Sequence, residues 1–145
     1  MKNVRNIIPL IILVFTLGSL AGCASQEEEE EAETKVTKRV GMVIKLKPEF
    51  IEEYKALHAD SNPGVRDLLN KANMHNFSIF LMQLEDGNYY EFGYYEYTGD
   101  DFEADMAWLA KQDRNIEWLK VCDPMQIPLE GYDGWAEMEL VYYNP

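Results

Sequence analysis

The dipeptide Asp86-Gly87 constrains the fold more than any other feature, because it separates two segments that are typical of β-strands. Residues 77–84 before it are mostly apolar, and residues 88–97 after it are dense in tyrosine and phenylalanine. Asp-Gly readily adopts the backbone angles that a tight hairpin turn requires. We therefore predict an antiparallel hairpin, on which the rest of the domain must build.

Two more segments, residues 40–46 and 135–143, show the period of two that indicates a strand with one buried face. The apolar side chains at alternate positions are Val40, Met42, Ile44 and Leu46 in the first segment, and Met138, Leu140 and Tyr142 in the second. Residues 124–134, just before the last strand, are rich in turn residues and are predicted to form a loop.

Between these strands, apolar residues recur at the spacing that is typical of helices. Pro48 suits the first turn of a helix, and Phe50, Tyr54, Leu57 and His58 then recur on one face. Residues 60–63, Asp-Ser-Asn-Pro, end that helix, and a second one is predicted from about Val65 to Ala72. Residues 100–111 and 115–121 form the corresponding helical pair after the hairpin.

The resulting order is β-α(α)-β-β-α(α)-β, which predicts an α+β domain of the ferredoxin-like, split-βαβ type. In that fold an antiparallel sheet carries its helices on one face. The chain has no second layer left to cover the other face. A symmetric homodimer, packed sheet on sheet, is the expected solution.

The N-terminal segment is predicted to lie outside this domain. Lys2 and Arg5 precede an apolar run from Ile7 to Leu20, which is typical of an export signal. Leu20-Ala21-Gly22-Cys23 resembles the lipobox of bacterial lipoproteins, which implies a signal peptide at residues 1–22, cleavage before Cys23 and lipidation of its thiol. The protein would then be anchored to the bacterial membrane on the periplasmic or surface side. The alternative is an uncleaved N-terminal anchor helix.

Residues 23–37 are predicted to form a lipidated acidic tether to a domain at residues 38–145. Glu27–Glu31 is an unbroken acidic run, which repels itself and stays solvated. Removal of the signal takes two of the 13 basic residues and none of the 26 acidic ones, leaving a net charge of −15. This charge argues against a nucleic-acid partner and is compatible with a neutral small-molecule ligand.

Cys122 is the one cysteine besides Cys23. With Cys23 lipidated, no intramolecular disulfide is available, so the core alone must hold the fold. Two interpretations of Cys122 remain open, a buried small hydrophobic residue and a reactive thiol.

Residues 38–145 resemble the L-rhamnose mutarotase family. The resemblance rests on the order and spacing of several pieces: Pro48, Glu53-Tyr54 with His58, the His75–Phe80 segment, Trp118 with Lys120, and the closing Val141–Pro145. It implies a dimeric α+β barrel that interconverts the anomers of L-rhamnose or a related deoxyhexose, without metal or cofactor. By the same resemblance His58 is the catalytic proton donor, and Tyr54, Phe77, Trp118 and Leu119 occupy substrate-binding positions.

Two of these positions, and a third at Asn62, depart from the family's pattern. The family has a tyrosine at Phe77, a second tryptophan at Leu119 and a tryptophan at Asn62. The lost contacts motivate a second hypothesis, an exported sugar-binding lipoprotein of the same fold without turnover. A third follows from the fold alone, since dimeric α+β barrels also include haem-binding proteins and cofactor-free oxygenases.

The chemistry of histidine supports the first hypothesis. Mutarotation opens the sugar ring, so that one proton goes onto the ring oxygen and one leaves the anomeric hydroxyl. A histidine with a pKa near 6.5 can perform either transfer near neutral pH. From spacing alone, His58 could equally be a helix-end residue that caps carbonyl groups. Glu96 is a candidate second acid–base group that could pair with His58.

The aromatic residues of 88–97 also have two interpretations. They can form the sheet core and the dimer interface, or they can line a sugar pocket, because tyrosine offers both a ring and a hydroxyl. Alternation along the strand assigns different residues to each role.

Overall fold

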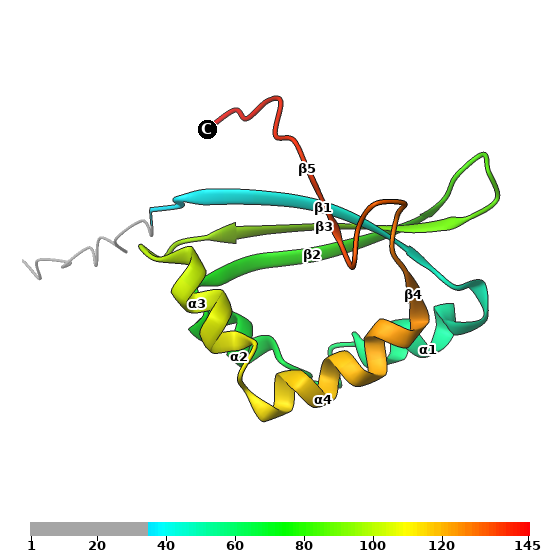
Figure 1. The fold of residues 1–145 in the computed structure, drawn as a ribbon, viewed down its shortest axis with the longest axis horizontal. Coiled ribbons are helices and arrows are strands. Elements are labelled where there is room, and N and C mark those ends of the chain that lie inside the picture. Colours follow the sequence, from blue (N-terminus) through cyan, green and yellow to red (C-terminus); the bar gives the residue numbers. More distant parts are fainter. Residues whose placement is uncertain (1–34) are drawn as a thin grey trace, which may run out of the picture. The chain divides into compact units, whose positions relative to one another are not determined.

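The computed structural model describes residues 35–145, which form one body (Figure 1). The predicted signal peptide, the lipidation site Cys23 and nearly all of the predicted tether lie outside the described residues. Within residues 35–145, no helix has the length and apolar character needed to cross a membrane.

The central strand of the sheet is β1 (Lys38–Leu46). Its whole length pairs antiparallel with β3 (Tyr89–Tyr97), in the register Lys38↔Tyr97 to Leu46↔Tyr89. Its other edge is shared by two short strands, β5 (Ala136–Met138) and β4 (Gln126–Ile127). With β2 (Met74–Gln83) beyond β3, the order across the sheet is β2-β3-β1-β4. The predicted antiparallel sheet is confirmed.

The predicted hairpin joins β2 and β3. Its turn is closed by a backbone hydrogen bond from the Leu84 amide to the Asn88 carbonyl, and the Asp86 carboxylate accepts from the Asn88 amide. Gly87 takes a φ of +80°, a left-handed conformation that glycine adopts without strain. The register of β2 shifts between His75 and Ser78, where Asn76 also has a positive φ. This bulge lets β2 begin three residues earlier than predicted.

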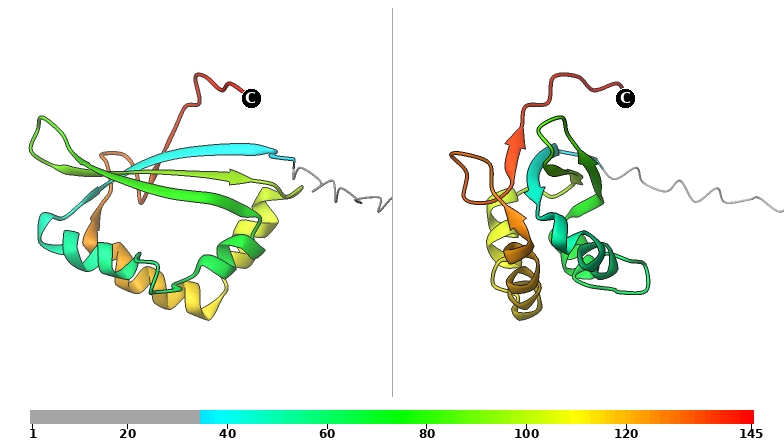
Figure 2. Two further views of the ribbon diagram at one scale, coloured as in Figure 1. Left: turned by 180° about the vertical axis from the view of Figure 1, so that it is seen from behind. Right: turned by 90° about the vertical axis from the view of Figure 1, so that its right-hand side faces the viewer.

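The helices cover one face of the sheet, as predicted (Figures 1 and 2). After β1 come the 3₁₀ turn η1 (Pro48–Phe50), α1 (Ile51–Leu57) and α2 (Arg66–Lys71). After β3 come α3 (Phe102–Leu109), α4 (Asp113–Cys122) and the 3₁₀ turn η2 (Asp123–Met125). Asp101 caps α3, because its carboxylate accepts from the Ala104 amide 3.0 Å away.

Two apolar clusters fill the space between sheet and helices. The first is built from α2, α3 and the sheet: Val40, Val65, Leu68, Ala72, Met74, Tyr95, Tyr97 and Leu109. The second joins α1 and the end of α4 to β1: Leu46, Tyr54, Cys122 and Met125. Trp118 on α4 packs against both clusters. It therefore lies at the boundary between the two halves of the core.

Two predictions about the C-terminal third are wrong. Residues 126 and 127, expected in a loop, form β4 opposite Lys45 and Leu46. The final strand, expected over residues 135–143, ends at Met138. Beyond it, Leu140, Val141 and Tyr142 are 57%, 85% and 75% exposed. No part of the described chain buries the apolar face that the alternation of residues 138–142 predicts, so packing does not hold these residues in the sheet.

Candidate functional site

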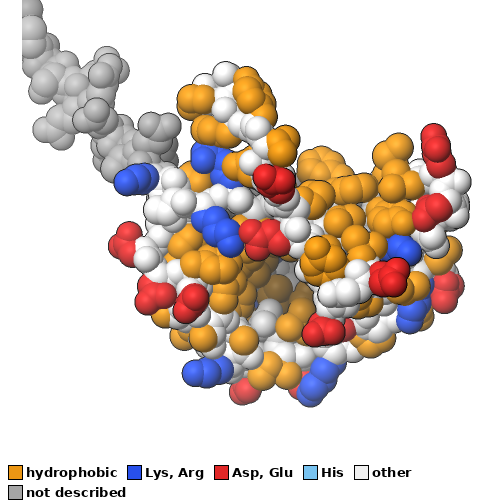
Figure 3. All heavy atoms as spheres, turned by 45° about the horizontal axis from the view of Figure 1, so that its top comes forward, with side chains coloured by type: hydrophobic (Ala, Val, Ile, Leu, Met, Phe, Trp, Pro, Cys, Tyr) orange, Lys and Arg blue, Asp and Glu red, His pale blue; other side chains and the backbone are white. Residues whose placement is uncertain are grey.

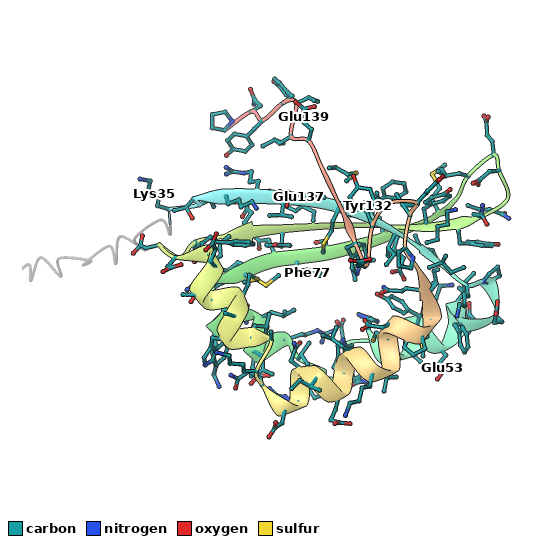
Figure 4. The ribbon with its side chains drawn as sticks, viewed as in Figure 1. Lys35, Glu53, Phe77, Tyr132, Glu137 and Glu139 are labelled. Carbon is teal, nitrogen blue, oxygen red and sulfur yellow. The ribbon has the colours of Figure 1, made fainter. Side chains whose placement is uncertain are left out.

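A cavity of about 600 Å³ lies between the sheet and the helices. All the predicted sugar-contacting residues line it: Tyr54, His58, Phe77, Trp118 and Leu119. Figure 4 shows Phe77 on the side of the sheet that faces the helices, and Figure 3 shows the surface hollowed near the middle of the face in view. The lining is mostly apolar with several amide side chains, the mixture that is usual for small-molecule sites.

Tyr54 and His58 stand one turn apart on α1, as their spacing predicts. Their rings stack with centroids 4.2 Å apart and an interplanar angle of 26°. The Nδ1 atom of His58 lies 2.9 Å from the Tyr54 carbonyl oxygen. Because a carbonyl can only accept, Nδ1 carries the proton in the neutral ring and the Nε2 lone pair is free to act as a base.

His58 is also the C-terminal cap of α1, where its backbone amide donates to the Tyr54 carbonyl at 3.2 Å. The two interpretations of His58, helix cap and cavity residue, are therefore compatible, because the backbone makes the cap and the ring lines the cavity. Arg66 of α2 fixes this helix end from outside by donating to the His58 carbonyl oxygen at 2.9 Å.

The surroundings of His58 favour its neutral form. Burial lowers the pKa of the imidazole, and the positive charge of Arg66 lowers it further, against the opposing effect of the Tyr54 carbonyl. The ring is therefore unprotonated at neutral pH and is poised to accept a proton.

Trp118 completes an aromatic wall beside these two residues. Its ring meets His58 edge-on, with centroids 5.2 Å apart and an interplanar angle of 75°. Its outer edge lies over Gly64, where a Cβ would come within 3.0 Å of the indole. Gly64 has a φ of +51°. Glycine at this position therefore permits both the turn before α2 and the close approach of the indole.

The three positions where the sequence departs from the family's pattern all line the cavity: Phe77, Leu119 and Asn62. Phe77 stacks on Tyr95 at 5.5 Å between centroids, so its ring is fixed against the sheet. Leu119 lines the cavity next to Trp118 and presents no aromatic surface. Trp135, just before β5, also lines the cavity and was missed from the sequence, because the loop before it gave no periodicity from which its facing could be predicted.

A buried polar network lies behind Tyr54. The Gln126 amide nitrogen donates to the Glu91 carboxylate at 2.7 Å and to the Tyr54 hydroxyl at 3.2 Å. Glu91 is 1% exposed, and burial raises the pKa of its carboxyl group to about 7. Sequence reasoning missed this network. The alternation of side chains along β3 could have indicated that Glu91 is buried, because Glu91 lies on the same face of the strand as Tyr95 and Tyr97.

Glu96 does not approach His58, so that proposed pairing is wrong. Side chains alternate along β3, and Glu96 lies on the face opposite Glu91 and Tyr95. There it accepts from the Asn76 amide at 2.6 Å and from the Tyr94 hydroxyl at 3.0 Å, and it pairs with Arg39.

Cys122 is buried at the end of α4. Burial raises the pKa of its thiol to about 12, with smaller contributions from the charges of Asp123 and Glu91. The thiolate form is therefore scarce at neutral pH. These surroundings favour a packing role over a reactive thiol.

Within residues 35–145, His, Cys, Asp and Glu side chains do not gather in groups of three or more that could bind a metal ion.

A family model and solved structures match this chain. The model of a family described as L-rhamnose mutarotase matches residues 39–144. The crystal structure of an L-rhamnose mutarotase from Formosa agariphila superposes with a TM-score of 0.56, at 21% sequence identity, and the match covers 75% of this chain and all of that one. No curated protein matches. The structural match confirms the α+β fold.

Proposed function

Because this chain belongs to the L-rhamnose mutarotase family of carbohydrate isomerases, we propose that it interconverts the two anomers of L-rhamnose or a related deoxyhexose. The observation that carries the proposal is the arrangement of His58. Its Nδ1 proton is held by the Tyr54 carbonyl, and its ring lies between Tyr54 and Trp118 in a cavity of about 600 Å³.

Ring opening begins with the anomeric hydroxyl. His58 Nε2 takes the hydroxyl proton, the electron pair of that O–H bond forms the C1 carbonyl, and the bond between C1 and the ring oxygen breaks. The imidazolium of His58 then gives its proton to the ring oxygen as that oxygen leaves, which yields the open-chain aldehyde and neutral His58. No electron is gained or lost, so the reaction requires no redox cofactor.

Ring closure reverses these steps on the other face of the carbonyl. After rotation about the C1–C2 bond, the hydroxyl that was the ring oxygen attacks C1 and loses its proton to His58 Nε2. The new anomeric oxygen takes a proton, which the imidazolium of His58 can supply. The lowered pKa of His58 makes this imidazolium a ready donor and regenerates the neutral base.

The aromatic residues would hold the sugar during this exchange. Trp118 offers its ring to the apolar face of the pyranose, and Tyr54 offers a hydroxyl to a sugar oxygen. The apolar lining around Phe77 and Leu119 suits a deoxyhexose, which carries a methyl group where other hexoses carry a hydroxymethyl group.

The alternative, a sugar-binding protein without turnover, rests on Phe77 and Leu119. Both line the cavity without the hydroxyl and the second indole that the family's pattern has there. Weaker orientation of the sugar would lower the rate before it abolished binding.

Magnetisation-exchange NMR on a panel of deoxyhexoses separates the two functions. The domain, residues 38–145, is mixed with each sugar at anomeric equilibrium, and the exchange rate is compared with that in buffer. Accelerated exchange on L-rhamnose or a relative supports the enzyme. Sugar-induced shifts of protein signals with exchange at the buffer rate would replace it with the binding protein.

We further propose that the protein is a homodimer packed through the outer face of its sheet. The side chains directly opposite one another on that face are largely aromatic, as in the pairs Phe80↔Phe92 and Met82↔Tyr90. Phe80 and Met82 are 64% and 59% exposed. Figure 3 shows hydrophobic side chains gathered toward the hairpin tip on this side. A second copy would bury them.

Export and lipidation are proposed from the sequence alone. Leu20-Ala21-Gly22-Cys23 would direct cleavage before Cys23 and acylation of its thiol. Replacement Cys23→Ala in the full chain is expected to release the protein from the membrane fraction or to leave the signal uncut. Normal processing with unchanged membrane retention would contradict this proposal.

A further inference from the structure

Glu91 is a buried carboxylate for which the reaction described above has no use. It lies in the middle of β3 and is 1% exposed. One carboxylate oxygen, Oε2, accepts from Gln126, and the other, Oε1, is buried without a hydrogen-bond partner among the described residues. A buried carboxylate with an unsatisfied oxygen is costly for folding and calls for an explanation.

The elements around Glu91 supply no positive charge. Directly across from it on β1 and β2 are Ile44 and Leu81. Tyr54 faces it from α1 and Cys122 acts on it from α4, and burial raises the pKa of both, so that both are neutral near pH 7. No ion pair to Glu91 is present in residues 35–145. Glu91 is therefore the group of this network that changes charge near neutrality.

The network ends at the sugar cavity. Gln126 and Tyr54 line the cavity, while Glu91 lies behind them and has no surface on it. Gln126 bridges the two, with its amide nitrogen 2.7 Å from Glu91 Oε2 and 3.2 Å from the Tyr54 hydroxyl. A hydrogen-bonded path from Glu91 to a sugar therefore runs through Tyr54 or Gln126.

We propose that Glu91 is a positioning residue that sets whether the Tyr54 hydroxyl donates its hydrogen bond to the sugar or to the buried carboxylate. This inference rests on the proposed function and deepens it.

The protonation state of Glu91 determines which way the Tyr54 hydroxyl donates its hydrogen bond. The ionised carboxylate needs donors, so it attracts the Tyr54 proton and leaves a Tyr54 lone pair facing the sugar. The protonated carboxyl already carries a hydrogen and needs fewer donors, so the Tyr54 proton is free to point into the cavity. Burial outweighs the opposing effects of Gln126 and Tyr54 and raises the pKa of Glu91 to about 7, so both states are populated at neutral pH.

Anomer exchange and sugar affinity should therefore both decline on the alkaline side of neutrality. As the pH rises through about 7, Glu91 ionises and Tyr54 stops donating to the sugar. Exchange and sugar affinity should then fall several-fold, up to roughly tenfold, which is the effect of one lost hydrogen bond. The sugar hydroxyls do not titrate in this range.

The test is the pH profile of anomer exchange and of sugar affinity, measured on wild type, Glu91→Gln and Tyr54→Phe. Glu91→Gln keeps the side-chain shape and removes the titration. Glu96→Gln is the matched control, because it makes the same change on the same strand but on the opposite face. The carboxyl carbon of Glu91 is followed by ¹³C NMR as an independent readout of its protonation.

The expected result is an alkaline limb near pH 7 in wild type and Glu96→Gln that is absent from both Glu91→Gln and Tyr54→Phe. In Tyr54→Phe the ¹³C signal should still titrate, which shows that Tyr54 transmits the effect. An alkaline limb that persists in folded Glu91→Gln or in Tyr54→Phe overturns the proposal.

Failure of the proposed function gives a different pattern. One such pattern is a wild type that binds sugar while the anomers exchange only at the buffer rate at every pH. That result rejects the mutarotase activity, and the pH profile of sugar affinity still decides the role of Glu91. A protein that neither exchanges nor binds any deoxyhexose contradicts both.

Discussion

Gly64 lies beneath the indole ring of Trp118, so close that a Cβ at position 64 would come within 3.0 Å of the ring. The contact joins the turn before α2 to α4, and it fixes one wall of the sugar cavity. Gly64 also has a left-handed φ of +51°. The shape of the proposed sugar site therefore depends on a residue that carries no functional group.

Substitution Gly64→Ala should reduce both stability and sugar binding. The left-handed backbone alone should lower the free energy of unfolding by about 1–2 kcal/mol. The new methyl group should also displace Trp118, which weakens binding. Gly87→Ala is the matched control, since Gly87 has a φ of +80° but a Cβ at position 87 would meet no atom within 4 Å. Denaturant unfolding and tryptophan fluorescence with added sugar measure the two effects. Equal loss of sugar affinity in both variants would contradict the account.

The lowered pKa of His58 predicts an acid limit to activity. Below this pKa the imidazole is protonated and can no longer take the anomeric proton, so exchange should fall as the pH drops. Because burial and Arg66 lower the pKa from its usual 6.5, activity should persist to a lower pH than an exposed histidine would allow. NMR titration of the imidazole, with the exchange rate corrected for the buffer reaction, measures both quantities. An imidazole that titrates above 6.5 would contradict the assignment.

Substitution Phe77→Tyr should raise exchange on L-rhamnose. It restores a hydroxyl at a position that lines the cavity, where one added hydrogen bond is worth about 1 kcal/mol, or roughly a fivefold change. Phe80→Tyr on the exposed face of the same strand is the control and should leave exchange unchanged. The exchange rate at subsaturating sugar is the readout. A lower rate in Phe77→Tyr would show that another sugar, or another geometry, is preferred.

The proposed dimer predicts that charge on the outer sheet face separates the subunits. Phe80→Lys combined with Met82→Lys places two ammonium groups among apolar neighbours that would be buried in the interface. Light scattering should give the dimer mass for wild type and the monomer mass for the double variant. Ile116→Lys, on an exposed position of α4, is the control and should remain dimeric. A wild-type protein that is a stable monomer at micromolar concentration would contradict the proposal.

Local sequence patterns predicted most of the fold, because they reflect backbone conformation and the burial of one face of a strand or helix. Asp86-Gly87 gave the hairpin through backbone conformation, and alternation gave β1 through one buried face. The pattern failed at residues 139–143, where the alternation is present but the described chain provides nothing to pack against it. It also missed β4, since two residues are too few to show a period.

The candidate site divides in the same way. Tyr54 and His58 are close in sequence, so helical spacing sufficed to bring them together. Gln126, Glu91 and Trp135 come from separate strands and loops, and only the pairing of those strands with β1 brings them near α1. The predicted pairing of Glu96 with His58 failed for the same reason. Alternation along β3 places Glu96 on the face of the sheet that points away from the helices.

Catalysis by His58 is tested most directly by magnetisation exchange between the anomers of L-rhamnose, with wild type, His58→Ala and His75→Ala compared at neutral pH. These are the two histidines of the chain, and His75 does not line the cavity. Loss of acid–base catalysis should lower the rate by roughly 10²–10⁴-fold. We predict that His58→Ala falls to the buffer rate with its fold intact by circular dichroism, while His75→Ala exchanges as wild type does. If folded His58→Ala exchanged the anomers as fast as wild type, His58 would be a helix cap without a catalytic role, and the central claim would be wrong.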